Sequence, residues 1–90
     1  MTDTSYSIEY KKSVEKELRK LPSTQLKNII TKISALARNP RPTGSVKLRG
    51  ASNLFRIRFA DYRIIYQVHD DKLIVLVVKV GHRREIYRDL

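Results

Sequence analysis

The sequence contains no cysteine. Without cysteine the chain has no disulfide framework, no thiolate nucleophile and no cysteine-based metal site, so its stability must come from a packed core or from a bound partner. The sequence also lacks a run of about eighteen apolar residues, the length needed to cross a membrane. The first five residues do not show the basic-then-apolar pattern of a secretory signal. We therefore expect a cytoplasmic protein that contacts no membrane and uses neither a metal nor a small-molecule cofactor.

Acidic residues are scarce as well. Nineteen Lys and Arg stand against nine Asp and Glu, which gives a formal net charge of +10 at pH 7, and no carboxylate occurs between Asn39 and Ala60. A field of this sign attracts nucleic acid, acidic lipid or an acidic protein, whatever the fold. The 31% of charged residues argue against a membrane protein. The expected partner is therefore a polyanion, and RNA in particular.

The length of the chain limits the kind of site it can build. Its 90 residues make one domain, residues 1–90, and a chain of this size buries only about 60–65% of the surface that it exposes when unfolded. This leaves room for one sheet and one helical layer, but not for a deep substrate cavity. An active site is expected to be an open surface, with part of its walls supplied by a partner.

Hydrophobic periodicity predicts the order of the elements. Apolar and polar residues alternate at the start of the chain, then apolar residues recur at helical spacing in two stretches that Pro22 separates, with Ser23 or Thr24 suited to cap the second. After a loop rich in Pro and Gly the period falls to two. The predicted elements are a strand at 5–10, helices at 11–21 and from 23 or 24 to 39, a short strand or extended lead-in at 46–49, strands at 54–59, 63–69 and 73–80, and a short helix or tail at 84–90. This order, β-α-α-β-β-β, predicts an α+β fold with a helical hairpin packed on one face of a mainly antiparallel sheet.

Strand parity predicts where the basic residues gather. In the strand at 54–59, Phe55 and its alternate neighbours share one face, while Arg56 and Arg58 share the other. The apolar face must be the one that packs on the helices. On the next strand the same rule places Arg63 on the open face, near Arg58. The core set is then Phe55, Ile57, Phe59, Ile64, Tyr66 and Val68, and the open face carries Arg56, Arg58 and Arg63, with Lys47 and Arg49 close in sequence. The strand at 73–80 is apolar on both faces up to Lys79, which predicts a central position.

The end of the chain adds further candidates. Arg83 and Tyr87 are four residues apart, so a tail that turns back beside the sheet would let both reach one site. Taken singly, Tyr87 is typical of a half-buried tail residue, and His82 is typical of a surface or capping histidine.

The ordered set of short motifs resembles a known family. The steps Lys47-Leu48-Arg49-Gly50, Phe55-Arg56-Ile57-Arg58, Tyr62-Arg63-Ile64-Ile65-Tyr66 and Val80-Gly81-His82-Arg83-Arg84-Glu85-Ile86-Tyr87 are similar to the RelE branch of the RelE/ParE toxin superfamily. The resemblance covers nearly the whole chain, the helical hairpin and the order of strands included. It implies the toxin of a type II toxin–antitoxin system, an mRNA endonuclease that enters the ribosomal A site and cuts the codon there, and a RelB-like antitoxin that wraps and neutralises it.

The resemblance also implies roles for single residues. The catalytic set carried over by position is Arg56, Arg58, Arg63, Arg83 and Tyr87, and the RNA-binding set is Lys47, Arg49, His82 and Arg84. One departure stands out, because the best-studied members have lysines where this chain has Arg56 and Arg58. A crowded lysine can lose its proton and act as a base, whereas arginine cannot. The departure leaves charge stabilisation by this pair intact and argues against proton abstraction by it.

RNA cleavage without a metal uses the 2′-hydroxyl as the nucleophile. The arginines suit the extra charge of the phosphorane, and Tyr87 is the preferred base, since nearby cations favour the phenolate. Arg83 or His82 would serve the leaving oxygen. A site of this kind is a feeble nuclease on free RNA, so the ribosome is expected to position the substrate. Two other functions stay open: a non-catalytic inhibitor of DNA gyrase, as in the ParE branch, and a plain nucleic-acid-binding module.

Overall fold

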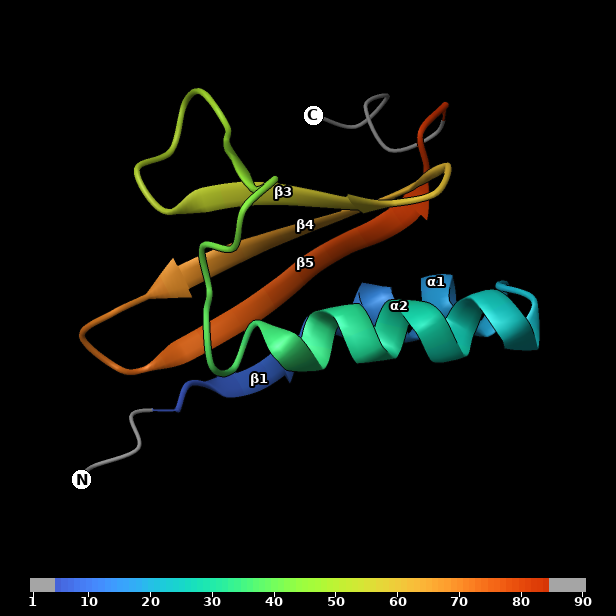
Figure 1. The fold of residues 1–90 in the computed structure, drawn as a ribbon, viewed down its shortest axis with the longest axis horizontal. Coiled ribbons are helices and arrows are strands. Elements are labelled where there is room, and N and C mark those ends of the chain that lie inside the picture. The colour runs from blue at the N-terminus through green and yellow to red at the C-terminus, as the bar shows by residue number, and fades with distance from the viewer. Residues whose placement is uncertain (1–4, 85–90) are drawn as a thin grey trace.

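The structure, a computed structural model, describes residues 5–84. Its elements are β1 (Ser7–Tyr10), α1 (Lys12–Arg19), α2 (Ser23–Ala35), β2 (Val46–Lys47), β3 (Leu54–Phe59), β4 (Tyr62–His69) and β5 (Ile74–His82). Figure 1 shows both helices on the same side of strands β3, β4 and β5. The predicted α+β fold is confirmed, and the segment expected to be a strand or a lead-in forms the two-residue strand β2. The predicted C-terminal helix or tail falls almost wholly outside the described residues.

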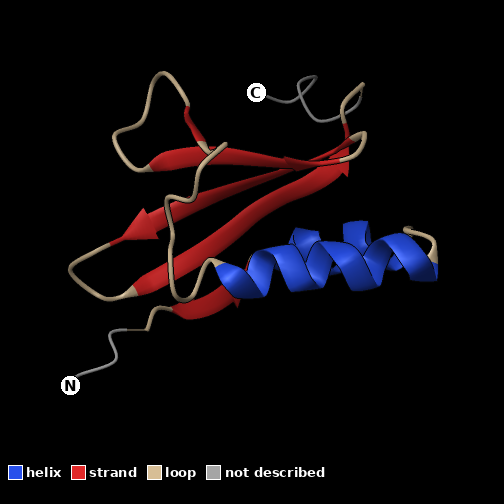
Figure 2. Cartoon of the chain, viewed as in Figure 1, coloured by secondary structure: helices blue, strands red, loops and turns tan. Residues whose placement is uncertain are grey.

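The sheet has five strands in the order β1-β5-β4-β3-β2. The β1–β5 pair is parallel and the other three pairs are antiparallel, so the sheet is mainly antiparallel, as predicted (Figure 2). Strand β5 lies between β1 and β4 and so is an interior strand, as its apolar sequence predicted. The strand is longer than expected, because it continues past Val80 to His82.

The second helix differs from the prediction at both ends. Its N-cap is Pro22, in extended conformation and without a side-chain cap, so neither Ser23 nor Thr24 caps it. The helix ends at Ala35 rather than at residue 39, because the chain tightens there into a series of turns. The carbonyl of Ala37 accepts a hydrogen bond of 2.7 Å from the backbone amide of Tyr6. That bond ties the end of the helical hairpin to the start of β1.

The core lies between the helices and the face of the sheet that they cover, where the buried side chains of both layers form one cluster. Ile29 and Ile33 of α2 are fully buried, and each contributes about 1.5–3 kcal/mol by leaving water. The buried set is Val14, Ile29, Ile33, Leu36, Phe55, Ile57, Ile64, Tyr66, Val68, Val75, Val77 and Val80, with Phe59 partly buried against it. The predicted core face of β3 and β4 is therefore confirmed.

A β-bulge in β5 decides which later residues face the helices. Ile65 pairs with Lys79 but Tyr66 pairs with Val77, so Val78 is an extra residue in the ladder. This insertion lets Val77 and Val80, three residues apart, both face the helices. The same register puts Lys79 on the opposite face, which we call the open face.

Candidate active site

Three arginines share the open face of the sheet, as parity predicted. Arg58 of β3 lies directly opposite Arg63 of β4 in the ladder, and Arg56 lies opposite Ile65. Residues directly opposite one another project to the same face, about 5 Å apart at Cβ. Because Phe55 and Ile57 on the same strand are core residues, the arginines project away from the helices. Like charges facing each other across strands are unfavourable, so the pair Arg58–Arg63 is costly until an anion neutralises it.

An apolar residue forms the floor of this face. Ile65 is 0% exposed although it faces away from the helices. Its ladder partners on the two neighbouring strands are Arg56 and Lys79, both half-buried. A hydrophobic floor between cations limits access of water, and charge interactions with a bound phosphate become stronger there.

The β3–β4 turn orients Arg63. Its Nη1 atom donates to the carbonyl oxygens of Ala60, at 3.4 Å, and Tyr62, at 3.2 Å. Ala60 itself has a φ of +53°, a left-handed conformation that is unfavourable for a residue with a side chain. Strain of this kind collects at functional sites, and here it lies in the turn that positions a candidate catalytic residue.

The same turn also holds Arg83. The backbone amide of Arg83 donates to the carbonyl of Asp61 at 2.7 Å, and its Nε lies 3.9 Å from Oδ1 of Asp61. Both side chains are more than half exposed, so the ion pair adds little stability. Its effect is positional, because it keeps Arg83 at the end of the sheet where Arg58 and Arg63 face each other. We call Arg56, Arg58, Arg63 and Arg83 the arginine cluster.

Two predicted RNA-binding residues lie on the other side of the sheet. Lys47 pairs with Phe55, a core residue, so its side chain belongs to the helix-covered face. His82 pairs with Tyr62, and their rings meet edge to face with centroids 5.9 Å apart. Neither residue therefore lies on the open face with the arginine cluster, because β2 pairs in a register that the sequence alone does not show and β5 continues to His82. Their role in RNA binding stays a prediction.

The remaining predicted residues are less constrained. Arg49 is exposed in the turn after β2, and Arg84 is exposed directly after β5, with its amide donating to Nδ1 of His82 at 3.2 Å. Tyr87 lies outside the described residues.

The chemistry available on the described open face is charge stabilisation. Arginine keeps its proton at any working pH, and His82 faces the opposite side. His69 is six residues along β4 from Arg63, roughly 20 Å away at the rise of a strand, and its Nε2 is hydrogen-bonded to Oε1 of Gln67 at 3.0 Å. Within residues 5–84, no group of three His, Asp or Glu side chains has the geometry to hold a metal ion. Likewise, none of the described helices is long and apolar enough to cross a membrane.

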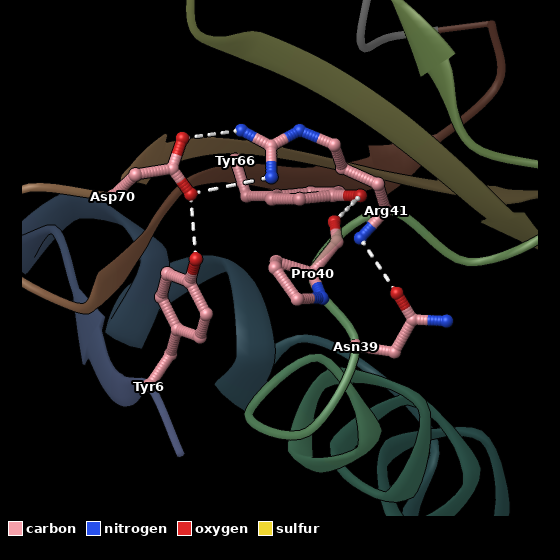
Figure 3. Close-up of polar contacts among 6 residues, drawn as sticks. All are labelled: Tyr6, Asn39, Pro40, Arg41, Tyr66 and Asp70. Atoms are coloured by element: carbon pink, nitrogen blue, oxygen red, sulfur yellow. Dashed lines mark hydrogen bonds and ion pairs between the residues drawn. The ribbon is translucent and has the colours of Figure 1, made fainter. Parts of the chain in front are cut away.

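Sequence reasoning missed a polar network on the helix-covered side (Figure 3). Arg41 donates through both terminal nitrogens to Asp70, at 3.2 and 2.7 Å, and Tyr6 donates to the same carboxylate. The guanidinium of Arg41 also lies 5.3 Å from the ring centre of Phe55, a cation–π distance. The hydrogen bond from Arg41 keeps the pKa of Asp70 below its ordinary value. The network joins the loop after α2 to the β4–β5 turn and to β1.

Tyr66 lies next to Arg41 and makes two further contacts in this region. Its hydroxyl donates to the carbonyl oxygen of Pro40 at 2.8 Å, and its ring stacks on Phe55. Burial raises the pKa of Tyr66 to about 12. No local motif signals the hydrogen bonds Arg41–Asp70 and Tyr66–Pro40, because they join residues 29 and 26 positions apart.

Comparison with known proteins gives consistent matches over most of the chain. Residues 8–87 match the family described as the ParE toxin of the type II toxin–antitoxin system parDE. The chain is 35% identical over 89 residues to the mRNA interferase toxin RelE of Escherichia coli, covering 94% of this chain and 93% of that protein. Among solved structures, the archaeal RelE–RelB complex from Pyrococcus horikoshii superposes with a TM-score of 0.80 at 28% identity, covering 90% and 98% of the two chains. The intact RelBE toxin–antitoxin complex of E. coli gives 0.77 at 34% identity, covering 87% and 96%.

Proposed function

Because the chain belongs to the RelE/ParE toxin superfamily, we propose that it is the toxin of a type II toxin–antitoxin system and that it acts by cleaving mRNA. The finer proposal is that it cuts the codon in the ribosomal A site and so stops translation in the cytoplasm. The observation that carries it is the pair Arg58–Arg63, directly opposed on the open face, with Arg83 held at the same end by Asp61.

The arginine cluster suits the charge that develops during RNA cleavage. Attack by the 2′-hydroxyl on the neighbouring phosphorus produces a phosphorane with one more negative charge than the phosphate. Two guanidinium groups on opposed residues can bracket one phosphate from both sides, each as a planar donor. A pair that repels itself in the free protein is relieved when that charge appears, so the interaction is strongest in the transition state.

Proton transfer requires a residue from outside the described face. We assign the base to Tyr87, which follows Arg83 by four residues and would have its phenolate stabilised by the cluster. The position of His82, on the far side of the sheet beside Tyr62, favours Tyr87 over His82. Arg83 then stabilises the negative charge on the leaving 5′-oxygen as the P–O5′ bond breaks, and this oxygen takes its proton from water.

We expect cleavage to depend on the ribosome, because the arginine cluster has no means of aligning the RNA. Fixed positive charge binds phosphate but does not by itself align the 2′-hydroxyl with the scissile bond. Alignment by a large partner is worth several orders of magnitude in rate. Arg49 and Arg84, exposed at the margins of the sheet, are suited to contact ribosomal or messenger phosphates, and Lys47 can do so only from the helix-covered side.

The antitoxin is the second proposed partner. The toxins in the P. horikoshii and E. coli structures are complexed with RelB proteins, and this chain carries a net charge of +10. We expect a RelB-like antitoxin with acidic segments to neutralise it. Their association should be fast and should slow as salt is added.

Primer extension on programmed ribosomes tests the proposal. Wild-type protein should produce a break within the A-site codon, and Arg58→Ala should reduce the rate by roughly a hundredfold or more, the usual loss for one charge-stabilising donor. Arg19→Ala is the matched control, because Arg19 is an exposed arginine on α1 and its loss should leave the rate unchanged. A gyrase supercoiling assay runs in parallel. Inhibition of gyrase without mRNA cleavage would assign the chain to the ParE type of activity instead.

A further inference from the structure

A pocket of about 270 Å³ lies on the helix-covered side, between α2 and β3. Ala35 and Leu36 at the end of α2 form one wall, and Ile57 of β3 forms another. Two cations, Lys32 and Arg58, complete the lining together with the loop residues Pro42, Thr43 and Gly44. The described lining thus combines an aliphatic interior with positive charge and contains no carboxylate.

The size and lining of the pocket restrict what it can bind. Pockets for drug-sized molecules begin at about 300 Å³, whereas a cavity of about 150 Å³ is enough for benzene, so this pocket suits a single large side chain. Nucleobases are held mainly by stacking on aromatic rings, and none of the described lining residues is aromatic. An aliphatic side chain of a protein is the better fit.

Arg58 connects this pocket with the arginine cluster. Strand β2 pairs only with Phe55 and Arg56, so Arg58 lies on a stretch of β3 that β2 does not cover. Arg58 is exposed and its side chain projects to the open face opposite Arg63, while the residue itself belongs to the pocket lining beside Ile57. A segment seated in the pocket therefore lies beside a candidate catalytic arginine and can reach its side chain only around the part of β3 that β2 does not cover.

We propose that this pocket is an anchoring site for the antitoxin, filled by one aliphatic side chain of an amphipathic acidic segment whose carboxylates pair with Lys32 and Arg58. The inference rests on the proposed function, since it assumes an antitoxin. Charge complementarity supports that occupant, because the rim carries only positive charge in a chain of net charge +10. Pairing with Arg58 would withdraw this arginine from phosphate, so that a contact outside the open face contributes to neutralisation.

The test fills the pocket or reverses its charge without touching the arginine cluster. Ala35→Leu narrows the pocket, and Ser34→Leu, at an exposed neighbouring position on the same helix, adds the same side chain outside it. Lys32→Glu reverses one rim charge, and Lys27→Glu makes the same change elsewhere on α2. Each toxin is purified after co-expression with its own antitoxin, freed by unfolding and refolding, and its binding to the purified antitoxin is measured by calorimetry and surface kinetics.

We expect each pocket variant to bind the antitoxin less tightly than its matched control. Ala35→Leu should speed dissociation roughly tenfold, the scale of a lost anchor, while Ser34→Leu should not. Lys32→Glu should weaken binding at low salt more than at high salt, and more than Lys27→Glu. Cleavage on ribosomes in the absence of antitoxin should be unchanged in all four, with circular dichroism verifying the fold.

Two outcomes would overturn the proposal. Equal antitoxin binding by each variant and its control would mean that the antitoxin does not use the pocket. Loss of mRNA cleavage by Ala35→Leu and Lys32→Glu with normal antitoxin binding would assign the pocket to RNA. Because binding is measured without reference to cleavage, a wild-type toxin that binds antitoxin but cuts no mRNA would refute the proposed nuclease activity and leave the pocket result standing.

Discussion

Replacing Tyr66 with phenylalanine removes one oxygen atom from the centre of the molecule. Tyr66 is 0% exposed, and its hydroxyl donates to the carbonyl of Pro40 at 2.8 Å. Pro40 is buried as well, so water does not simply replace the lost donor. The ring, with its stack on Phe55, stays in place. The substitution therefore isolates one buried hydrogen bond with little change in packing.

The magnitude follows from the unsatisfied carbonyl. A buried acceptor left without its donor costs about 1–3 kcal/mol, and we expect about 1.5 kcal/mol here, since the ring fills the same space. In a domain of 60–100 residues each kcal/mol lowers Tm by about 4–8 °C. Tyr66→Phe should therefore melt roughly 6–12 °C below wild type.

Thermal and urea unfolding, followed by circular dichroism, measure this loss. The matched control is Tyr10→Phe, which removes the same atom from a residue that is 36% exposed on the edge strand β1 and should change stability by less than about 0.5 kcal/mol. Cleavage per folded molecule should be unaltered in both, because Tyr66 faces away from the arginine cluster. Equal melting of Tyr66→Phe and wild type would refute the reasoning, as would equal losses in the two variants.

Alkaline titration gives an independent check. Burial raises the pKa of Tyr66 in the folded state to about 12 from its ordinary value of 10.0, so the folded protein holds this proton more tightly than the unfolded chain does. The resulting stabilisation is complete below pH 10 and disappears as the pH rises through 12. The stability difference between wild type and Tyr66→Phe should therefore shrink over that range. A difference that stays constant to pH 12 would contradict the raised pKa.

Three further predictions concern the turn and the cluster. Ala60→Gly should stabilise the protein by about 0.5–1 kcal/mol in urea unfolding, because glycine adopts the positive φ of this turn without strain; a loss of stability would remove the argument for strain. Arg56→Lys combined with Arg58→Lys should keep most ribosomal cleavage with an unchanged pH optimum if fixed charge is all that these positions supply, and an optimum shifted toward neutrality would mean that a lysine has become the base. Arg83→Ala and Tyr87→Phe should each sharply reduce A-site cleavage with little loss of ribosome binding, and a fully active Tyr87→Phe would exclude the tyrosine as the base.

The sequence was sufficient to predict which residues of β3 project from the open face, because strand parity depends only on the local alternation of apolar and polar residues. Once Phe55 and Ile57 are assigned to the core, Arg56 and Arg58 must project the other way, and the ladder confirms it. A short turn at residues 60–62 was expected between these strands, which brought Arg63 near Arg58. In the structure Phe59 already pairs with Tyr62, and this register sets Arg63 directly opposite Arg58.

The positions that the sequence does not reveal depend on pairing between distant parts of the chain. Lys47 lies in a two-residue strand whose register is set by its contact with β3, and a shift by one residue would reverse its direction. His82 was expected beyond the end of its strand, but pairing with Tyr62 extends β5 to it. Arg41 and Asp70 are 29 residues apart and meet only in the folded chain. Such contacts follow from packing and leave no local pattern.

The parallel pairing of β1 with β5 has a consequence for the order in which the toxin is made. Ser7–Tyr10 have no strand partner until residues 74–77 exist, and Val75, Val77 and Val80 supply a large part of the core. During synthesis at about 5–20 residues per second, the N-terminal strand must wait several seconds for the strand that completes the sheet. A chain whose translation stops before β5, for instance because its own message has been cut, lacks the strand that joins β1 to β4. Such fragments cannot assemble the arginine cluster with Arg83, so only finished molecules become nucleases.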